Sequence, residues 1–178
     1  MPDFQYAFTV DAPQSAVAKF HEDTSALRKL SPPPIFAQLH NIEPLAEGSV
    51  SEFTLWFGPF PARWRAVHSG VSASGFTDTQ EAGPLQSWQH QHQFVAIDEN
   101  RTEVRESIKY EHPAGFRGLL TRLVFSKPGL WGLFTYRKLA TRQALSAPAS
   151  RPKWALPALF VAGLAVAALL VGYWLNRS

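Results

Sequence analysis

The sequence predicts an α+β fold in which a curved antiparallel sheet surrounds a long C-terminal helix, followed by one transmembrane helix. Three observations predict it. Six short alternating segments are separated by tight turns, as in a sheet of consecutive hairpins. Apolar residues change to helical spacing after residue 115. A long uncharged segment lies near the C-terminus. A hydrophobic content of 46% and an aromatic content of 13% exclude a disordered chain.

The first elements are one strand and two short helices. Phe4–Val10 alternates apolar and polar residues and is predicted to be a strand. Asp11 is the predicted N-cap of the first helix, with Pro13 early in it. A second helix is expected over Ser25–Leu30. The prolines at 32–34 must end it, because proline cannot continue a helix.

Six strands should follow, joined by short turns, all but one of which contain glycine, proline or asparagine. The predicted strands are Ile35–Glu43, Ser51–Phe57, Ala62–Ser72, Gly75–Gln80, Ser87–Ile97 and Thr102–Glu111. Such short connections favour an antiparallel meander.

The last element before the membrane segment is a helix. Its apolar residues Phe116, Leu119, Leu120, Leu123 and Val124 follow helical spacing. Pro128-Gly129 should break or kink it, and the helix should then continue to about Leu145. A curved sheet can bury its concave face only by receiving this helix.

The chain divides into a domain and an anchor. Residues 1–146 form one domain, 147–153 a linker, Trp154–Leu175 a transmembrane helix and 176–178 a tail. At ~1.5 Å per residue, the 22 uncharged residues of the anchor span about 33 Å, enough for a hydrocarbon core of ~30 Å.

The orientation of the anchor follows from its flanks. The N-terminus has no signal-peptide pattern, and basic residues concentrate before the anchor, which predicts a single-pass membrane protein with a cytosolic domain. The pairs Gly163/Ala167 and Ala168/Gly172 permit a homodimer through the membrane helix.

The charge of the chain is unevenly distributed. Three of the 17 basic residues, Arg151, Lys153 and Arg177, flank the anchor, and the remaining 14 equal the 14 acidic residues. A neutral domain argues against nucleic acid as a partner. The absence of cysteine excludes disulfides.

From His112 to Ser150 there are only basic charges, at Arg117, Arg122, Lys127, Arg137, Lys138 and Arg142. This face is expected to lie in solvent near anionic headgroups, or Arg137 instead caps the cavity.

Several motifs carry a family resemblance over residues 4–146. They are Leu30-Ser-Pro-Pro33, Trp64, Phe76-x-Asp78-x-Gln80, Gly83-Pro84-Leu85, Trp88-x-His90-x-His92-x-Phe94, Thr102 to Tyr110 and Tyr136-Arg137. With these motifs the chain resembles the START-like, or SRPBCC, superfamily, in particular its bacterial cyclase/dehydrase branch, and it is similar to coenzyme Q-binding START proteins. The resemblance implies a helix-grip fold that holds a hydrophobic ligand between sheet and long helix.

Strand alternation assigns the candidate site. The predicted concave face carries Trp88, His90, His92 and Phe94 from one strand and Val104, Glu106, Ile108 and Tyr110 from the next. The hairpin then places Glu106 opposite His92 or one diagonal step away. Phe53, Leu55, Phe57 and Trp64 would form the other wall, although simple core packing explains each of them equally well.

The inward acid and histidines have three interpretations. They contact the polar group of a ligand, they satisfy one another in a filled core, or Glu106, His90 and His92 perform acid/base catalysis. No metal and no cofactor are predicted. Asp78 and Gln80 form either a second inward polar pair or a brace for the turn at Gly83.

The sequence therefore predicts a membrane-tethered protein that binds, carries or presents an apolar small molecule such as a lipid, an isoprenoid or a quinone-like compound. The alternatives are a polyketide-cyclase-like or dehydratase-like enzyme, and an interaction module whose pocket is filled by its own side chains. The expected partners are the apolar ligand and the membrane lipid around Trp154–Leu175.

Overall fold

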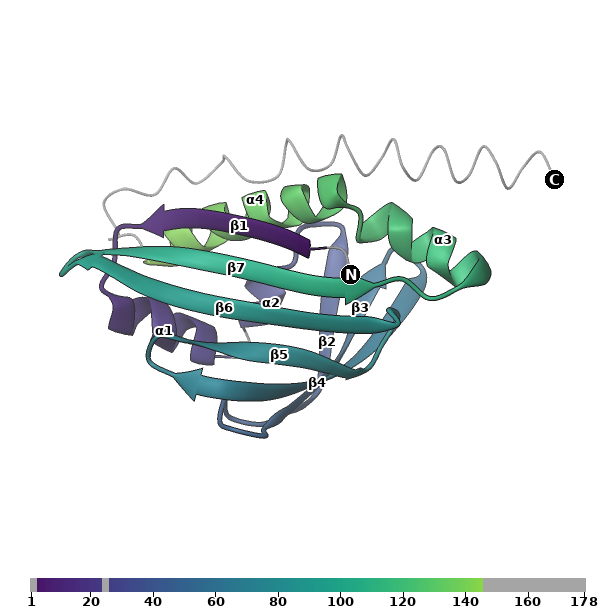
Figure 1. Cartoon of the computed structure of the whole chain (residues 1–178), viewed down its shortest axis with the longest axis horizontal. Coiled ribbons are helices and arrows are strands. Elements are labelled where there is room, and N and C mark those ends of the chain that lie inside the picture. Colours follow the sequence, from purple (N-terminus) through teal and green to yellow (C-terminus); the bar gives the residue numbers. More distant parts are fainter. Residues whose placement is uncertain (1–2, 24–25, 146–178) are drawn as a thin grey trace.

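The fold is a seven-stranded antiparallel sheet that wraps around helices, as a computed structural model of residues 3–23 and 26–145 describes it (Figure 1). The strands are β1 (Asp3–Val10), β2 (Ile35–Ile42), β3 (Val50–Phe57), β4 (Phe60–Ser72), β5 (Gly75–Ala82), β6 (Ser87–Asp98) and β7 (Arg101–Glu111). The helices are α1 (Gln14–Glu22), α2 (Ala26–Lys29), α3 (Gly115–Val124) and α4 (Lys127–Leu145). The order across the sheet is β1-β7-β6-β5-β4-β3-β2.

The α+β helix-grip architecture is thus confirmed, but the C-terminal part of the prediction lies outside the described residues. This holds for the linker 147–153, the anchor Trp154–Leu175 with its dimer contact, and the tail 176–178. Within the described residues, no helix is both long and apolar enough to cross a membrane.

The strands follow the predicted boundaries to within one residue, except at the end of β5, which continues two residues past the predicted Gln80, and at the start of β4. This strand begins at Phe60, two residues before the predicted Ala62, and Phe60 pairs with Phe57 across the hairpin. Gly58 has φ of 61°, which suits a two-residue hairpin turn. The loop is therefore only Gly58-Pro59, and Pro61 lies within the strand opposite Trp56.

The predicted N-cap of the first helix is wrong. The cap position is Pro13 rather than Asp11, and no side chain bonds to the free amides. The extended backbone of Pro13 lets its carbonyl accept from the amides of Ala16 and Val17, which starts the helix without a polar cap. The second helix comprises Ala26–Lys29, inside the predicted range.

The C-terminal helix is divided into two, and the break lies before the predicted position at Pro128-Gly129. Phe125 and Ser126 separate α3 from α4, so Pro128 is the second residue of α4. Proline is tolerated there because the first-turn amides have no helical partner. A Cβ on Gly129 would lie 2.3 Å from the Val124 carbonyl oxygen, so this close approach of the two helices requires glycine.

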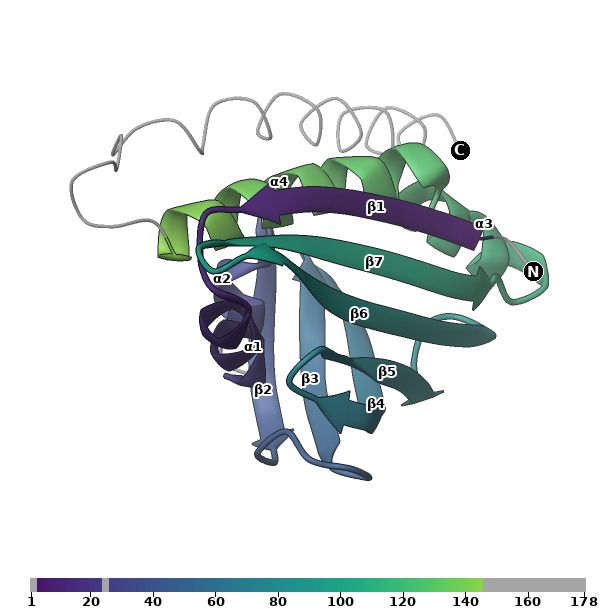
Figure 2. The same cartoon turned by 60° about the vertical axis from the view of Figure 1, so that its left-hand side comes forward.

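The interior contains two apolar clusters. The first joins α4 and Phe125 to the middle of the sheet; its buried members are Phe4, Trp64, Ala66, Leu85, Trp88, Ile108, Tyr110, Phe125, Leu130 and Phe134. The second lies beneath α1; its buried members are Phe8, Val10, Ala12, Val17, Ala18, Phe76, Phe94 and Val104. Figure 2 shows α4 running along β1 and β7, while β2 and β3 cross at a steep angle. The curved sheet thus encloses both clusters.

Candidate functional site

Polar side chains from three adjacent strands meet on the concave face of the sheet. In the register of β5 and β6, Asp78 pairs with His90. In the register of β6 and β7, His92 pairs with Glu106. The sequence left two registers open for Glu106, and the structure has the directly opposite one. We call Asp78, His90, His92 and Glu106 the polar cluster.

Within the polar cluster each imidazole lies between two carboxylates. Oε2 of Glu106 is 2.8 Å from Nε2 of His90 and 2.9 Å from Nδ1 of His92. Oδ2 of Asp78 is 3.2 Å from Nε2 of His92 and 3.5 Å from Nδ1 of His90. His90, His92 and Glu106 are buried, and Asp78 is partly exposed. The Glu106 contact with His92 lacks hydrogen-bond geometry, so it acts through charge.

The cluster holds separated charges in the interior. Burial alone lowers the pKa of His92, but Glu106 and Asp78 outweigh it and raise the pKa to about 9. Burial likewise opposes ionisation of the carboxyls, yet His90 and His92 keep the pKa of both Asp78 and Glu106 well below the usual range. His92 is therefore a cation and both acids are anions at neutral pH.

Two further histidines adjoin the cluster, and the sequence analysis missed both. His21 of α1 has its ring 6.0 Å from that of His92 and its Nδ1 2.9 Å from the Val17 carbonyl. Burial, followed by the charge of His92, lowers the pKa of His21 to about 4, so its ring is neutral and Nδ1 donates to Val17. Nε2 of His68 in β4 lies 3.7 Å from Oδ1 of Asp78.

Arg137 of α4 supplies the second positive charge. Its Nε donates to the Leu30 carbonyl at 3.3 Å, and its guanidinium carbon lies 5.1 Å from the centre of the Phe134 ring. Burial lowers the pKa of Arg137, while Glu106 and Asp78 act in the opposite direction. With His92, it balances the two carboxylates. Arg137 is only partly exposed, and its charge acts on the carboxylates of the polar cluster. Its role as a cap of the cavity stays a prediction.

The predicted apolar lining residues separate into two groups on either side of the polar cluster. Trp64, Trp88, Ile108 and Tyr110 belong to the first apolar cluster, with Phe53 and Phe57 partly buried against it. Phe94 and Val104 belong to the second. Leu55 is half-buried and belongs to neither. The polar cluster is thus bordered by aromatic and aliphatic walls.

Asp78 and Gln80 were expected to be either an inward polar pair or a brace for the turn at Gly83. The structure shows the first arrangement for Asp78 and the second for Gln80. Asp78 is the inward acid of the polar cluster. The amide nitrogen of Gln80 donates to the Leu85 carbonyl at 2.8 Å, which braces the turn that contains Gly83.

Three members of the polar cluster could also hold a metal ion. One ligand atom each from Asp78, His90 and His92 lies within 4.8 Å of the others, and His and carboxylate are suitable ligands for a divalent transition metal. Both imidazoles are also paired with carboxylates. The prediction of no bound metal and no cofactor stays a prediction.

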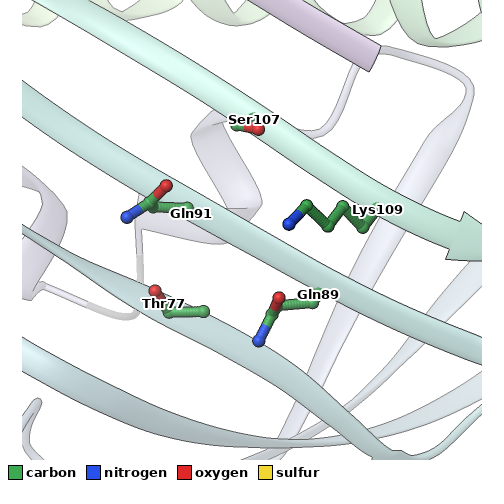
Figure 3. A pocket seen from close by; sticks show the side chains of 5 residues that line it. All are labelled: Thr77, Gln89, Gln91, Ser107 and Lys109. Carbon is green, nitrogen blue, oxygen red and sulfur yellow. The ribbon is translucent and has the colours of Figure 1, made fainter. Parts of the chain in front are cut away.

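A separate hollow of about 250 Å³ lies on the opposite, outer face of the sheet (Figure 3). Its lining residues are Thr77, Gln89, Gln91, Ser107 and Lys109, which alternate with the concave residues of β5, β6 and β7. All five are polar or charged, so this hollow does not suit an apolar ligand.

Comparison with solved structures identifies the fold. The Zhui aromatase/cyclase from Streptomyces sp. R1128 matches with a TM-score of 0.61 and 15% identity, over 85% of this chain and 99% of that one. A START superfamily protein from Mycobacterium smegmatis matches with a TM-score of 0.59 and 9% identity, over 80% of this chain and 96% of that one. Norcoclaurine synthase from Thalictrum flavum matches with a TM-score of 0.59 and 13% identity, over 82% of this chain and 89% of that one. That structure is a complex with dopamine and hydroxybenzaldehyde.

No family model and no curated protein matches the sequence. At these identities the structural likeness establishes the fold and leaves the chemistry to the site. The chain has the START-like, or SRPBCC, helix-grip fold.

Proposed function

We propose that this protein binds an apolar small molecule between its sheet and α4, and that the polar cluster with Arg137 orients one polar group of that molecule. The observation that carries the proposal is a set of opposite charges, buried at His92 and Glu106 and partly exposed at Asp78 and Arg137, between two apolar clusters. A mostly apolar site with a few convergent polar groups is the usual form of a small-molecule site.

Arg137 favours a ligand with an acceptor such as a carbonyl or hydroxyl oxygen. A guanidinium has five N–H donors, and the described residues provide one hydrogen-bond acceptor, the Leu30 carbonyl. The other donors can bond to a ligand oxygen. Because His92 and Arg137 already balance Asp78 and Glu106, a neutral ligand would leave the charge balance intact. A quinone-like compound, an isoprenoid alcohol or a neutral lipid satisfies both conditions.

Partly exposed apolar side chains mark where such a ligand would lie. Tyr6, Phe53, Phe57, Val124 and Leu133 pack against the first apolar cluster without being buried completely. They come from both the sheet and the helices that cross it. A bound apolar molecule would cover this remaining surface, at roughly 25 cal/mol per Å².

The proposal includes a membrane tether through Trp154–Leu175 and a cytosolic domain. Its support is the uncharged length of that segment and the basic residues before it. A tether keeps the site near the bilayer, where an apolar ligand concentrates. Protease treatment of sealed vesicles tests the orientation, because a cytosolic domain must be digested in vesicles that expose their cytosolic face.

Native mass spectrometry of the purified chain, followed by solvent extraction, tests the binding. We expect one apolar molecule per chain, lost in Leu133→Trp, whose larger ring would occupy the space beside the first apolar cluster. Leu139→Trp is the matched control because Leu139 is exposed on the same helix. A chain that carries no ligand and refuses quinones, fatty acids and isoprenoids would instead favour the interaction module.

A cyclase-like or dehydratase-like activity is the second candidate. It is favoured by the 2.8 Å contact between Glu106 and His90, a carboxylate and an imidazole in an apolar interior. Glu106→Gln removes the proton-accepting group while keeping the shape of the side chain. Turnover of a proven substrate by this variant at the wild-type rate would eliminate the enzyme proposal.

A further inference from the structure

We infer that α3 is a lipid-docking helix, whose outward apolar face enters the surface of an anionic bilayer. The inference rests on the proposed function, because it presents the protein to the membrane from which the ligand would come. It concerns a surface that the ligand site does not use.

The first observation is an apolar stripe that faces away from the protein. Four large side chains within the ten residues of α3 are exposed: Phe116 by 70%, Leu119 by 65%, Leu120 by 50% and Leu123 by 57%. They follow the spacing of one helix face. A continuous apolar patch of this kind on a folded surface indicates a partner.

The outward direction of this stripe is fixed by the opposite face of α3. A Cβ on Gly118 would lie 1.9 Å from the Pro113 carbonyl oxygen, so this side of the helix is in direct contact with the chain before it. Thr121, on the same side, is buried and has its Oγ1 2.9 Å from Nδ1 of His112. The helix cannot turn its apolar stripe inward without breaking both contacts.

Basic residues border the stripe on both sides. With about 3.6 residues per turn, Arg117 and Arg122 fall at opposite edges of the face centred on Phe116 and Leu123. Both arginines are exposed, as is Lys127 at the start of α4. This arrangement is that of a helix lying in a membrane interface, with its apolar face among acyl chains and its cations at the headgroups.

The charge pattern selects anionic lipid over two other occupants. No acidic residue occurs from His112 to Ser150, so a second copy docked through the same face would bring like charges together. The uncharged segment Trp154–Leu175 of the chain itself could cover the leucines, but it offers no partner for the two arginines. Anionic headgroups satisfy the arginines, and the acyl chains accept the stripe.

Figures 1 and 2 place α3 at one end of the molecule, directly after β7 and before α4. Val124 and Phe125 at its C-terminal end reach the first apolar cluster. Lipid docking would therefore bring the bilayer surface next to the interior where we propose that the ligand binds.

The test uses the full chain, which has no cysteine, so a single labelled cysteine reports one position. Leu119→Cys places an environment-sensitive fluorophore in the stripe, and Gln91→Cys is the matched control on the polar outer face of the sheet. Both are reconstituted into vesicles of phosphatidylcholine and phosphatidylglycerol that contain lipids with a quencher high on the acyl chain.

We expect at least about a twofold loss of fluorescence at position 119 and none at 91, because an interfacial helix enters the acyl boundary to roughly 5–10 Å. A water-like, unquenched probe at position 119 would overturn the inference. So would a blue-shifted but unquenched probe, which would mean that protein covers the stripe, either the C-terminal segment or a second copy.

Ligand extracted from the same vesicles separates this inference from the proposed function. Retained ligand with an unquenched probe rejects only lipid docking by α3. A quenched probe without any bound apolar compound rejects only the ligand site.

Discussion

Replacing Glu106 by glutamine should destabilise the folded chain by about 3 kcal/mol at pH 7. The carboxylates raise the pKa of His92 from 6.5 to about 9 against the opposing effect of burial, with Glu106 the largest contributor. At ~1.4 kcal/mol per pKa unit, this shift corresponds to about 3 kcal/mol of interaction with the charged imidazole. Loss of one partner from a buried ion pair costs a similar ~3–5 kcal/mol. Glutamine keeps the size of the side chain but removes its charge.

The effect should depend on pH in one direction. Between pH 6.5 and 9 the folded chain binds more protons at His92 than the unfolded chain does, so the free energy of unfolding falls as pH rises. The contribution is complete below pH 6.5 and is lost as pH rises through 9. The difference between wild type and Glu106→Gln should therefore shrink over this range.

Urea unfolding, monitored by tryptophan fluorescence, measures the difference in the free energy of unfolding between the two proteins. Trp64 and Trp88 report on unfolding because they lie in the first apolar cluster. Glu103→Gln is the control: Glu103 lies on the same strand but pairs with Arg105 at the surface, where loss of the pair costs less than about 1 kcal/mol. If Glu106→Gln were as stable as Glu103→Gln at pH 7, the charge coupling that we assign to the polar cluster would be refuted.

Three other predictions follow from the same contacts. Phe134→Ala should lower the free energy of unfolding by about 3–5 kcal/mol, because Phe134 is fully buried, whereas Leu139→Ala at the exposed surface should change little in the same urea titration. Gly75→Ala should destabilise by more than about 1 kcal/mol, since a Cβ there would lie 2.0 Å from the His92 carbonyl oxygen at a φ of 141°; thermal unfolding no different from wild type would contradict this. NMR of the imidazole nitrogens should show His92 charged and His21 neutral at pH 6, and a His21 that titrates near 6.5 would count against its burial beside His92.

The sheet could be predicted because its residues alternate. Glutamine side chains are readily solvated, which assigns Gln89, Gln91 and Gln93 to the outer face. Alternation along the strand then placed His90 and His92 on the concave face. The short loop after residue 97 then limited β7 to two registers. Strand periodicity is a local property of the sequence, which is why it predicted this part of the site well.

Contacts between distant elements could not be obtained in the same way. His21 reaches His92 only because α1 packs on β6. Its position four residues after the buried Val17 puts it on the same helix face, and this was the available signal. Arg137 has a similar signal, because it follows the buried Phe134 by three residues on α4, but this spacing does not reveal that Glu106 and Asp78 lie nearby.

Helical spacing likewise cannot say what a helix face meets. The spacing of Phe116, Leu119 and Leu123 predicted α3 correctly, yet the stripe faces outward and Leu130 and Phe134 of α4 fill the interior instead. The direction was decided by Gly118, where the backbone approaches Pro113 too closely for any side chain.

A crystal structure of the chain purified gently with whatever it carries would test the central claim most directly. The account predicts elongated density between the sheet and α4, with one polar atom within hydrogen-bond distance of Arg137 or the polar cluster. An interior filled entirely by the side chains of the two apolar clusters, with Arg137 bonded only to protein, would contradict it.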